Sequence, residues 1–398
     1  TSTAAKLSGK SIDDATGKAS TVIVTDLHSF DTADLSTITT NSVTTTVTSN
    51  ITNFTGDLGT AVVTLNDTVE FTSTAAKLSG KSIDDATGKT STVIVTALHS
   101  SDTADLSTIT TNSVTAALTE DVTFTGNLGT AVVTVADDKT LTAAANILAN
   151  NKIDQATGGK TNGAIKVTMT KDDTAAQDEA VDLTTITGSA VVTSITVTND
   201  MTFSGTLHAT ADTTLADTVT FTSTAAKLSG KKVVDATGGT STVIVTALSN
   251  TSDLSKIETN SVTTTVTGNI TGFTGDLGTA VVTLAKDVSF TSTAAKLSGK
   301  TIGDVDGNAA TVIVTGLDTT DGKIADLSKI TTDSVTSALT KDVTFTGNLG
   351  TAVVTVADGK TLTAAANILA GNEINKAGTT GAIKVTMTKD DTAAQDEA

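Results

Sequence analysis

The 398-residue chain carries 43 acidic and 25 basic side chains, a formal net charge of −18, and it contains no Cys, Pro, Trp or Tyr. The basic residues are all Lys, and aromatic residues make up only 2% of the chain. Nucleic acid is therefore excluded as a primary partner, because binding it needs cations to neutralise phosphates and aromatic rings to stack on bases. The lack of Cys excludes disulfides, thiolate metal sites and thiol nucleophiles.

The chain is a repeat array. TSTAAKLSGK at residues 1–10 returns at 72–81, 222–231 and 291–300, and a divergent form, TAAANIL, occupies 142–148 and 363–369. These spacings define related units of about 70 residues inside a long period of about 220 residues, which is typical of arrays grown by duplication. We divide the chain into 1–221, a first long repeat of three units, and 222–398, a second long repeat that stops early. We expect one continuous solenoid that is a fragment of a longer chain.

Short β-branched segments bounded by Gly, Asn or Asp predict the strands. They include TVIVT at 21–25, VTTTVT at 43–48, AVVTL at 61–65 and VTFT at 122–125. Their spacing indicates about three coils per unit, or about 24 residues per coil, as in β-solenoids. The predicted fold is all-β, a β-solenoid (parallel β-helix) of stacked coils, with at most single helical turns in AAKLSGK and AAANILA. The absence of Pro agrees with this, because Pro deletes a ladder hydrogen bond.

The duplicated copies show which positions tolerate change. Asp67 becomes Lys286, whereas Phe71 is kept as Phe290. Retained apolar residues beside positions whose charge changes are what alternation across a strand predicts, with the apolar side chains inside and the variable ones in solvent. One connection has nine residues at 27–35, seven at 248–254 and eleven at 317–327, which marks a surface loop between coils.

No constellation of catalytic residues emerges. His28 and His99 occupy equivalent positions, but the later copies have Ser249 and Asp318 there, so we interpret them as loop residues. His208 lies in the segment 181–221, which occurs once and has no copy for comparison. The carboxylates drift between copies and no Arg is present, whereas carbohydrate-active β-helices combine clustered acids or a metal with a basic residue. The prediction is a protein that is not an enzyme and requires no cofactor.

A calcium ion is the one metal for which the sequence offers ligands. Asp304, Asp306 and Asn308 resemble the opening of a D-x-D-G-N calcium loop, although the downstream bidentate Glu of an EF-hand loop is absent. The equivalent copies read IDDATGK, so the motif is not repeated. We predict a calcium site at these three residues and leave open the alternative, a solvated acidic face.

Partners other than the chain itself receive little support. No apolar stretch approaches the length of about 18 residues that a membrane span needs. Regular Thr ranks can order water in ice-binding solenoids, but the rank in VTTTVT at 43–48 is broken in VTAALT at 114–119. Sequons such as the one at Asn50 leave surface glycans open as partners. Self-association is favoured, because the terminal ladders of a solenoid are templates for further strands.

The amino-acid sequence of the repeats resembles that of very large Thr/Ala/Asp-rich repeat proteins of bacterial surfaces. An example is ADLSTITTNSVTAALTEDVTFTGNLGTAVVTVADDKTLTAAANIL at 104–148. It is most similar to the giant cell-surface proteins of marine cyanobacteria and to related β-strand-repeat adhesins, and the similarity spans nearly the whole chain. The resemblance implies an extracellular or cell-surface structural role and carries no catalytic residue across.

Three functions follow as hypotheses. The first is a self-assembling filament or surface-layer subunit that associates with neighbouring repeats or subunits. The second is the stalk or spacer of a large adhesin. The third, least favoured, is a carbohydrate-active β-helix enzyme.

Overall fold

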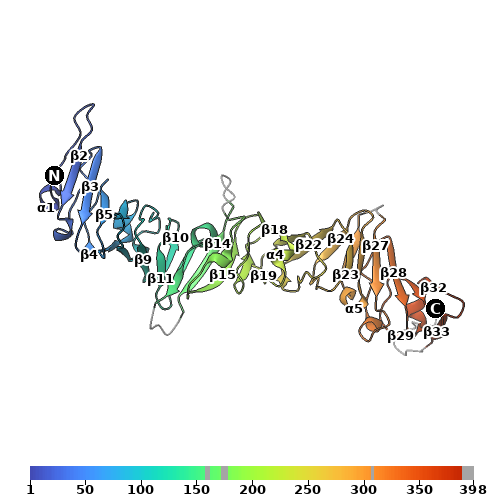
Figure 1. Cartoon of the computed structure of the whole chain (residues 1–398). Coiled ribbons are helices and arrows are strands. Elements are labelled where there is room, and N and C mark those ends of the chain that lie inside the picture. Colours follow the sequence, from blue (N-terminus) through green and yellow to red (C-terminus); the bar gives the residue numbers. More distant parts are fainter. Residues whose placement is uncertain (157–161, 172–177, 306–308, 388–398) are drawn as a thin grey trace. The chain divides into compact units, whose positions relative to one another are not determined.

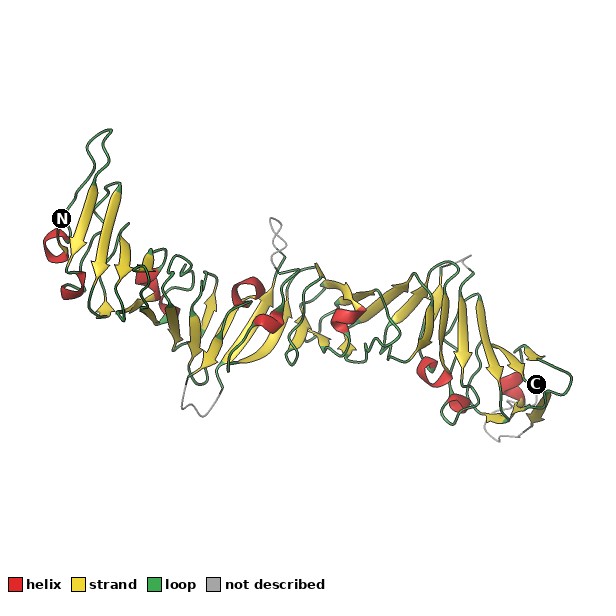
Figure 2. Cartoon of the chain, in the orientation of Figure 1, coloured by secondary structure: helices red, strands yellow, loops and turns green. Residues whose placement is uncertain are grey.

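The computed structural model describes residues 1–156, 162–171, 178–305 and 309–387. Over these residues the chain winds through about 19 turns of a β-solenoid built from parallel ladders (Figure 1). The helices are single turns between strands (Figure 2). The predicted fold class is therefore confirmed. Contacts divide the chain into two compact units, unit 1 formed by Thr1–Thr196 with His208–Ala211, and unit 2 formed by Val197–Leu207 with Asp212–Ala398.

Unit 1 contains three sheets, numbered here in chain order. Sheet 1 consists of β1 (Ser2–Thr3), β2 (Thr21–Thr25), β3 (Ser42–Val47), β5 (Val62–Leu65) and β7 (Ile83–Asp85). Sheet 2 consists of β4 (Ile51–Phe54), β6 (Glu70–Thr74), β8 (Thr92–Thr96), β9 (Ser113–Leu118), β11 (Val132–Val135) and β13 (Ile153–Gln155). Sheet 3 contains β10 (Val122–Phe124), β12 (Thr140–Ala144), β14 (Ala164–Met169) and β15 (Val191–Val197).

Unit 2 is built in the same way. It contains a ladder of β17 (Asp212–Leu215), β19 (Val233–Asp235) and β21 (Ile257–Glu258). Sheet 4 consists of β16 (Met201–Phe203), β18 (Thr220–Thr224), β20 (Thr242–Thr246), β22 (Ser261–Val266), β24 (Val281–Leu284) and β26 (Ile302–Asp304). Sheet 5 consists of β23 (Ile270–Phe273), β25 (Ser289–Thr293), β27 (Thr311–Thr315), β28 (Ser334–Leu339), β30 (Val353–Val356) and β32 (Ile374–Lys376). Sheet 6 consists of β29 (Val343–Phe345), β31 (Thr361–Ala365) and β33 (Ala382–Thr386).

The α-helical turns occur in AAKLSGK and AAANILA, where the sequence predicts them, whereas the 3₁₀ turns lie in connections for which no helix is predicted. The α-helices are α1 (Ala4–Leu7), α2 (Ala75–Leu78), α3 (Ala145–Leu148), α4 (Ala225–Leu228), α5 (Ala294–Leu297) and α6 (Ala366–Leu369), and the 3₁₀ turns are η1 (Leu27–Ser29), η2 (Leu98–Ser100), η3 (Leu183–Thr185) and η4 (Gly322–Ile324). Gly80, with φ of 68°, ends the turn after α2, and its N–H donates to the Asp105 carbonyl one turn later at 2.8 Å. A left-handed residue is most favourable for Gly and is tolerated by Asn, which occupies the equivalent position as Asn150 with φ of 63°, so the helix stops where the next turn must be contacted.

The turns are shorter than the spacing of the Val-rich segments predicts. Thr21 pairs with Ser42 and Val133 with Ile153, so register partners are offset by about 20 residues. The difference arises after AAKLSGK, where β7 contributes a ladder strand that the spacing does not reveal. A unit of about 70 residues, the distance from Thr21 to its copy Thr92, is consequently about 3.5 turns rather than three.

Because each unit contains about 3.5 turns and not a whole number, one sheet ends and another begins within each unit. In unit 1, sheets 1 and 2 share turns, since β3 leads to β4, β5 to β6 and β7 to β8. Sheet 1 then ends at an isolated bridge between Ile83 and Ile109, and the following strands β9 and β10 belong to sheets 2 and 3. In unit 2, sheet 4 ends in the same way at Ile302 and Ile330. Copies of one motif therefore lie in different sheets: TVIVT forms β2 in sheet 1, β8 in sheet 2, β20 in sheet 4 and β27 in sheet 5.

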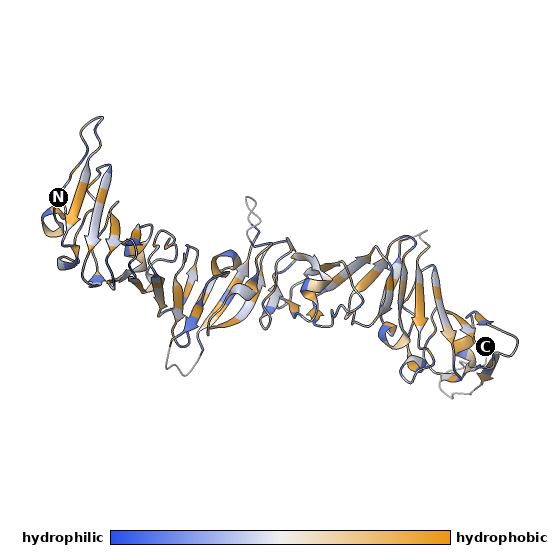
Figure 3. Ribbon diagram, viewed as in Figure 1, coloured by the Kyte–Doolittle hydropathy of each residue, from blue (hydrophilic) through white to orange (hydrophobic). Residues whose placement is uncertain are grey.

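The core lies between the two sheets that share a turn. Alternate residues of most strands are buried, and Figure 3 shows the hydrophobic residues on the strands and many hydrophilic ones in the connections. Phe rings of successive turns contact one another at a tilt, with centroids 5.6 Å apart for Phe54 and Phe71 and 5.4 Å apart for Phe273 and Phe290. The buried Ser73 hydroxyl donates to the Phe54 carbonyl at 2.6 Å. Burial of each ring contributes about 1.5–3 kcal/mol, so these contacts hold neighbouring turns together.

A glycine corner joins four of the sheets to the preceding turn, after β4, β10, β23 and β29. In the motif T-G-[D/N]-L-G, a Cβ added to the first Gly would lie 2.0 Å from a carbonyl oxygen of the turn below, that of Ala33 for Gly56 and that of Ser252 for Gly275. The backbone there donates and accepts directly, with Asp57 N–H to Ala33 O at 2.9 Å and Leu35 N–H to Asp57 O at 2.7 Å. Only Gly allows this approach of two backbones.

We expect Gly275→Ala to destabilise unit 2 by about 2 kcal/mol or more, because the clash is with backbone and cannot be relieved by a rotamer change. Gly268→Ala is the matched control, since its added Cβ meets nothing within 4 Å and the first copy has Ser49 there. Thermal unfolding followed by circular dichroism, with hydrogen exchange of residues 250–285, measures both. Equal stability of the two variants would contradict the corner.

Candidate functional site

The predicted calcium ligands fall in two places. Asp306 and Asn308 lie outside the described residues. Asp304 ends β26, and its carboxylate accepts the Asp333 N–H from the next turn at 2.8 Å. Its copies do the same, as when Asp85 accepts the Asn112 N–H at 2.7 Å. Asp304 and its copies therefore have a structural role, because each carboxylate accepts an N–H from the next turn. The calcium site stays a prediction.

The histidines lie in the connections that the sequence indicates. His28 is in η1, and His99 in η2 has Nε2 3.7 Å from a carboxylate oxygen of Glu120 and Nδ1 3.4 Å from the Thr119 hydroxyl. The Glu120 side chain is 71% exposed. His99, whose side chain is 22% exposed, thus meets an exposed carboxylate in a connection whose copies replace His by Ser or Asp, which is the geometry of a surface contact.

Most of the carboxylates are used to join turns. Asp57 Oδ1 accepts the Gly59 N–H at 2.8 Å and Lys81 Nζ from the next turn at 2.9 Å, and Lys81 also donates to the Gly59 carbonyl at 3.0 Å. Asp276, Gly278 and Lys300 repeat the arrangement in unit 2.

Two other copies change both members of the pair, and a third has Thr206 at the Asp position but keeps Lys231. Asn127 and Asn348 replace the Asp, and Asn151 and Asn372 replace the Lys. Both amide oxygens of the first pair still accept a Gly N–H, that of Gly129 and that of Gly350, at 3.0 Å. The Asn residues at the Lys positions instead donate to their own helical turns, Asn151 to the Ile147 carbonyl at 2.8 Å. Both charges are thus lost in two copies, whereas the copy with Thr206 keeps Lys231, so the Lys is not retained only where the carboxylate is present.

Several of these carboxyls are held ionised by hydrogen bonds. The pKa of Asp105 lies below its ordinary value because the Ser107 hydroxyl, at 2.6 Å, and the Ser107 N–H, at 3.0 Å, donate to it. The same contacts lower the pKa of its copies Asp34, Asp253 and Asp326. The pKa of Asp57 is lowered by the Gly59 N–H and then by Lys81. These shifts stabilise the corners and create no proton donor or base for catalysis near neutral pH.

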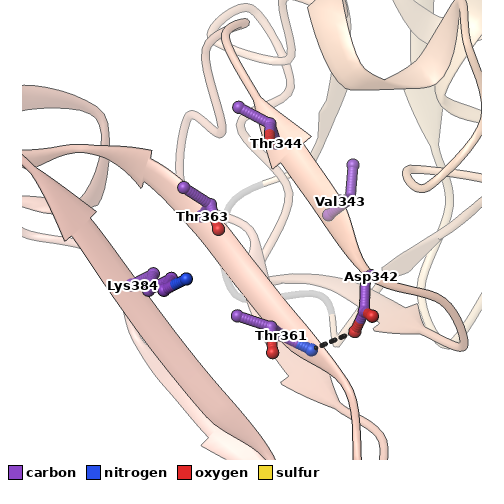
Figure 4. A pocket seen from close by; sticks show the side chains of 6 residues that line it. All are labelled: Asp342, Val343, Thr344, Thr361, Thr363 and Lys384. Carbon is purple, nitrogen blue, oxygen red and sulfur yellow. Dashed lines mark hydrogen bonds between the residues drawn. The ribbon is translucent and has the colours of Figure 1, made fainter.

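A polar hollow recurs at the start of sheets 3 and 6. In unit 2 it has a volume of about 260 Å³ and is lined by Asp342, Val343, Thr344, Thr361, Thr363 and Lys384 (Figure 4). The equivalent residues of unit 1, Asp121, Val122, Thr123, Thr140, Thr142 and Lys166, line a hollow of about 220 Å³. Lys384 and Thr363 are register partners, and Asp342 accepts the Thr361 N–H at 2.8 Å.

The hollow offers hydroxyls, one ammonium and one carboxylate that already caps a strand. This set can hydrogen-bond a hydroxylated or anionic molecule, but it lacks a base placed to activate a nucleophile. Sequence reasoning misses the hollow because Asp121 and Lys166 are far apart in the chain and only the ladder register brings them to one face. One feature of the sequence could have indicated the hollow: AIKVT has Lys at its third position, where the other copies have the Ile of TVIVT.

The features described so far define a repeat β-solenoid whose charged groups serve the fold. No family model matches the chain, and neither a curated protein nor a solved structure matches it. Among the described residues no three His, Asp or Glu side chains are grouped closely enough to hold a metal ion. Within the same parts of the chain, no helix is long and apolar enough to cross a membrane.

A double-mutant cycle tests the compensated pair. Asp276→Asn and Lys300→Asn should each destabilise unit 2 by about 0.5–1 kcal/mol, since the partner group is left without its counterpart. The double variant reproduces Asn348 with Asn372 and should recover most of the loss. Chemical denaturation measures all four proteins. Additive losses in the double variant would show that the two residues act independently.

The pH dependence of stability follows from the lowered carboxyl pKa values. Each of these groups has a folded pKa below the unfolded value of 3.8, so its contribution is fully present above about pH 4 and is lost as the pH falls through the folded pKa. The melting temperature should therefore hold from pH 7 to about 5 and fall below about pH 4. Relief of repulsion among 43 acidic groups acts in the opposite direction. A melting temperature that rises below pH 4 would show that repulsion outweighs the corner bonds.

Proposed function

We propose that the chain is a non-enzymatic structural protein of an extracellular or cell-surface array. The array lengthens when further solenoid turns stack on the turns of this chain. The chain works as a filament or surface-layer subunit whose stiffness comes from backbone ladders between successive turns. The resemblance of its repeats to bacterial surface proteins supports the location. The turn-to-turn use of its carboxylates supports a structural role.

One comparison within the chain carries the proposal. The hexapeptide AIKVTM occurs at 164–169 in unit 1 and at 382–387 in unit 2. In unit 1 it forms β14, which is followed in sheet 3 by β15, and Ile165 and Val167 are at most 1% exposed. In unit 2 it forms β33, where Ile383 is 39% and Val385 55% exposed. A strand like β15 is what this face fits, whether the same polypeptide or another copy supplies it.

The energy available for such stacking is substantial. Covering Ile383, Val385 and Met387, which is 74% exposed, removes three large apolar side chains from water. Each contributes up to about 1.5–3 kcal/mol on full burial. A new parallel ladder also pairs the edge of β33, whose one neighbouring strand among the described residues is β31. Electrostatic repulsion between acidic chains opposes the contact and weakens as salt is added.

Electron microscopy of the purified chain tests the proposal. We expect particles that lengthen with concentration, and Ile383→Lys with Val385→Lys should shorten them, because Lys cannot be buried in the new ladder without a partner. Lys384→Thr on the same strand is the control and should leave lengthening intact. Arms with calcium and with chelator test the predicted ion. Particles of one chain length under every condition would instead support the spacer hypothesis.

A further inference from the structure

The outer sheet faces carry a repeated row of Ile, Thr and Val, which we call the ITV row. In sheet 5 it consists of Ile313, Thr336 and Val353, which are neighbours because Ile313 pairs with Thr336 and Thr336 pairs with Val353. Its copies are Ile23, Thr44 and Val62 in sheet 1; Ile94, Thr115 and Val132 in sheet 2; Ile244, Thr263 and Val281 in sheet 4.

Core packing does not explain why the row is kept. Its side chains point outward, and Ile23 and Val281 are each 44% exposed. All three residues are nevertheless the same in all four copies, although nearby positions change charge, as when Glu120 becomes Lys341. An exposed apolar residue that duplication leaves unchanged among drifting neighbours points to a contact made on the outside.

The surroundings of the row in sheet 5 are uncharged. In sheet 5 the outward positions of four adjacent strands contain no Asp, Glu or Lys; they are Ser289, Thr291, Thr293, Thr311, Ile313, Thr315, Ser334, Thr336, Ala338, Val353 and Thr355. Such a face is unusual on a chain whose net charge is −18. Charged groups lie instead in the connections and corners, so the face is flat, β-branched and neutral.

Sheets 3 and 6 provide the contrast. There the Ile position is occupied by Lys166 and Lys384, each the register partner of a Thr, as Ile94 is of Thr72. These are the faces that carry the polar hollow. The chain therefore presents two kinds of outer face: those with the ITV row, of which that of sheet 2 also carries the exposed Glu70, and those with Lys at the Ile position.

We propose that the faces of sheets 1, 2, 4 and 5 that carry the ITV row bind a second copy of this chain side by side, ITV row against ITV row. The inference rests on the proposed function and specifies its lateral contact. Two chains of charge −18 repel one another, and a neutral face is where their surfaces can approach closely without burying unpaired charge.

The size of the face fixes the kind of assembly. Four strands about 4.8 Å apart and about five residues long cover roughly 300 Å², well below the about 800 Å² per partner of a standard interface. One face is too small for a stable dimer, so binding depends on several faces acting together. In each unit the faces with the ITV row lie on two sheets that share a core and look away from each other, so a chain has neighbours on both sides. The expected product is a layer.

Variants at the Ile position test the proposal, because Lys166 and Lys384 show that Lys there is compatible with the fold. We expect the combined substitutions Ile23→Lys, Ile94→Lys, Ile244→Lys and Ile313→Lys to raise the concentration for assembly at least tenfold, although the variant is less negatively charged. A second variant with Ser at all four positions should have a smaller effect in the same direction. Sedimentation and electron microscopy measure assembly, and circular dichroism confirms folding.

The reverse change is a gain-of-function test. Lys166→Ile with Lys384→Ile should create two more neutral faces and lower the assembly concentration. Raising salt from 10 to 500 mM should also lower it in the native chain, since the screening length falls from about 30 Å to a few Å.

Different experimental outcomes would contradict the stacking contact and the lateral contact. Lengthening without layers, unchanged by either set of Ile variants, would overturn the lateral proposal and leave the stacking proposal intact. Layers that survive Ile383→Lys with Val385→Lys would overturn the stacking proposal and leave the lateral proposal intact. A chain that stays monomeric at millimolar concentration in 500 mM salt, yet adsorbs to crystalline polysaccharide or ice through the same faces, would overturn self-association as their use.

Discussion

Parallel pairing of each turn with the one before is the constraint on which the other features depend. A ladder offset of about 20 residues requires that strands, corners and helical turns recur at matching heights. The first Gly of the T-G-[D/N]-L-G corner follows from it, since backbones of successive turns approach within hydrogen-bond distance there. The buried Ser73 and the compensated Asp57–Lys81 pair are further consequences, because polar groups enclosed between turns need partners.

A unit of about 3.5 turns gives the duplicated sequence a second property. Each copy of TVIVT moves to another sheet, so one motif supplies outer faces with the ITV row in different directions. An integral unit would align all copies on one side. The sheet changes also limit each ladder to a few strands before the next begins, with bridges such as Ile83 to Ile109 marking the change.

Much of the fold could be predicted, and the missing part has a physical reason. TVIVT and VTTTVT predicted their strands because β-branched residues alternate between core and solvent. The turn length could not be derived, because the period of the duplicated sequence gives the spacing of the copies and does not give the number of turns in each copy. Asp304 resembled a calcium ligand by local spacing, whereas its copy Asp85 shows that a carboxylate here accepts an N–H from the next turn, which only the register reveals.

Spin labelling tests the half-turn relation most directly, and the chain has no native Cys to interfere. Labels on Cys introduced at Ile23 and Thr44, which are register partners, should show strong dipolar broadening. Labels at Ile23 and its copy Ile94 should show none, because these residues lie on different sheets of unit 1. If each unit were three whole turns, Ile23 and Ile94 would lie on one face about 14 Å apart, and broadening of that pair would contradict the account.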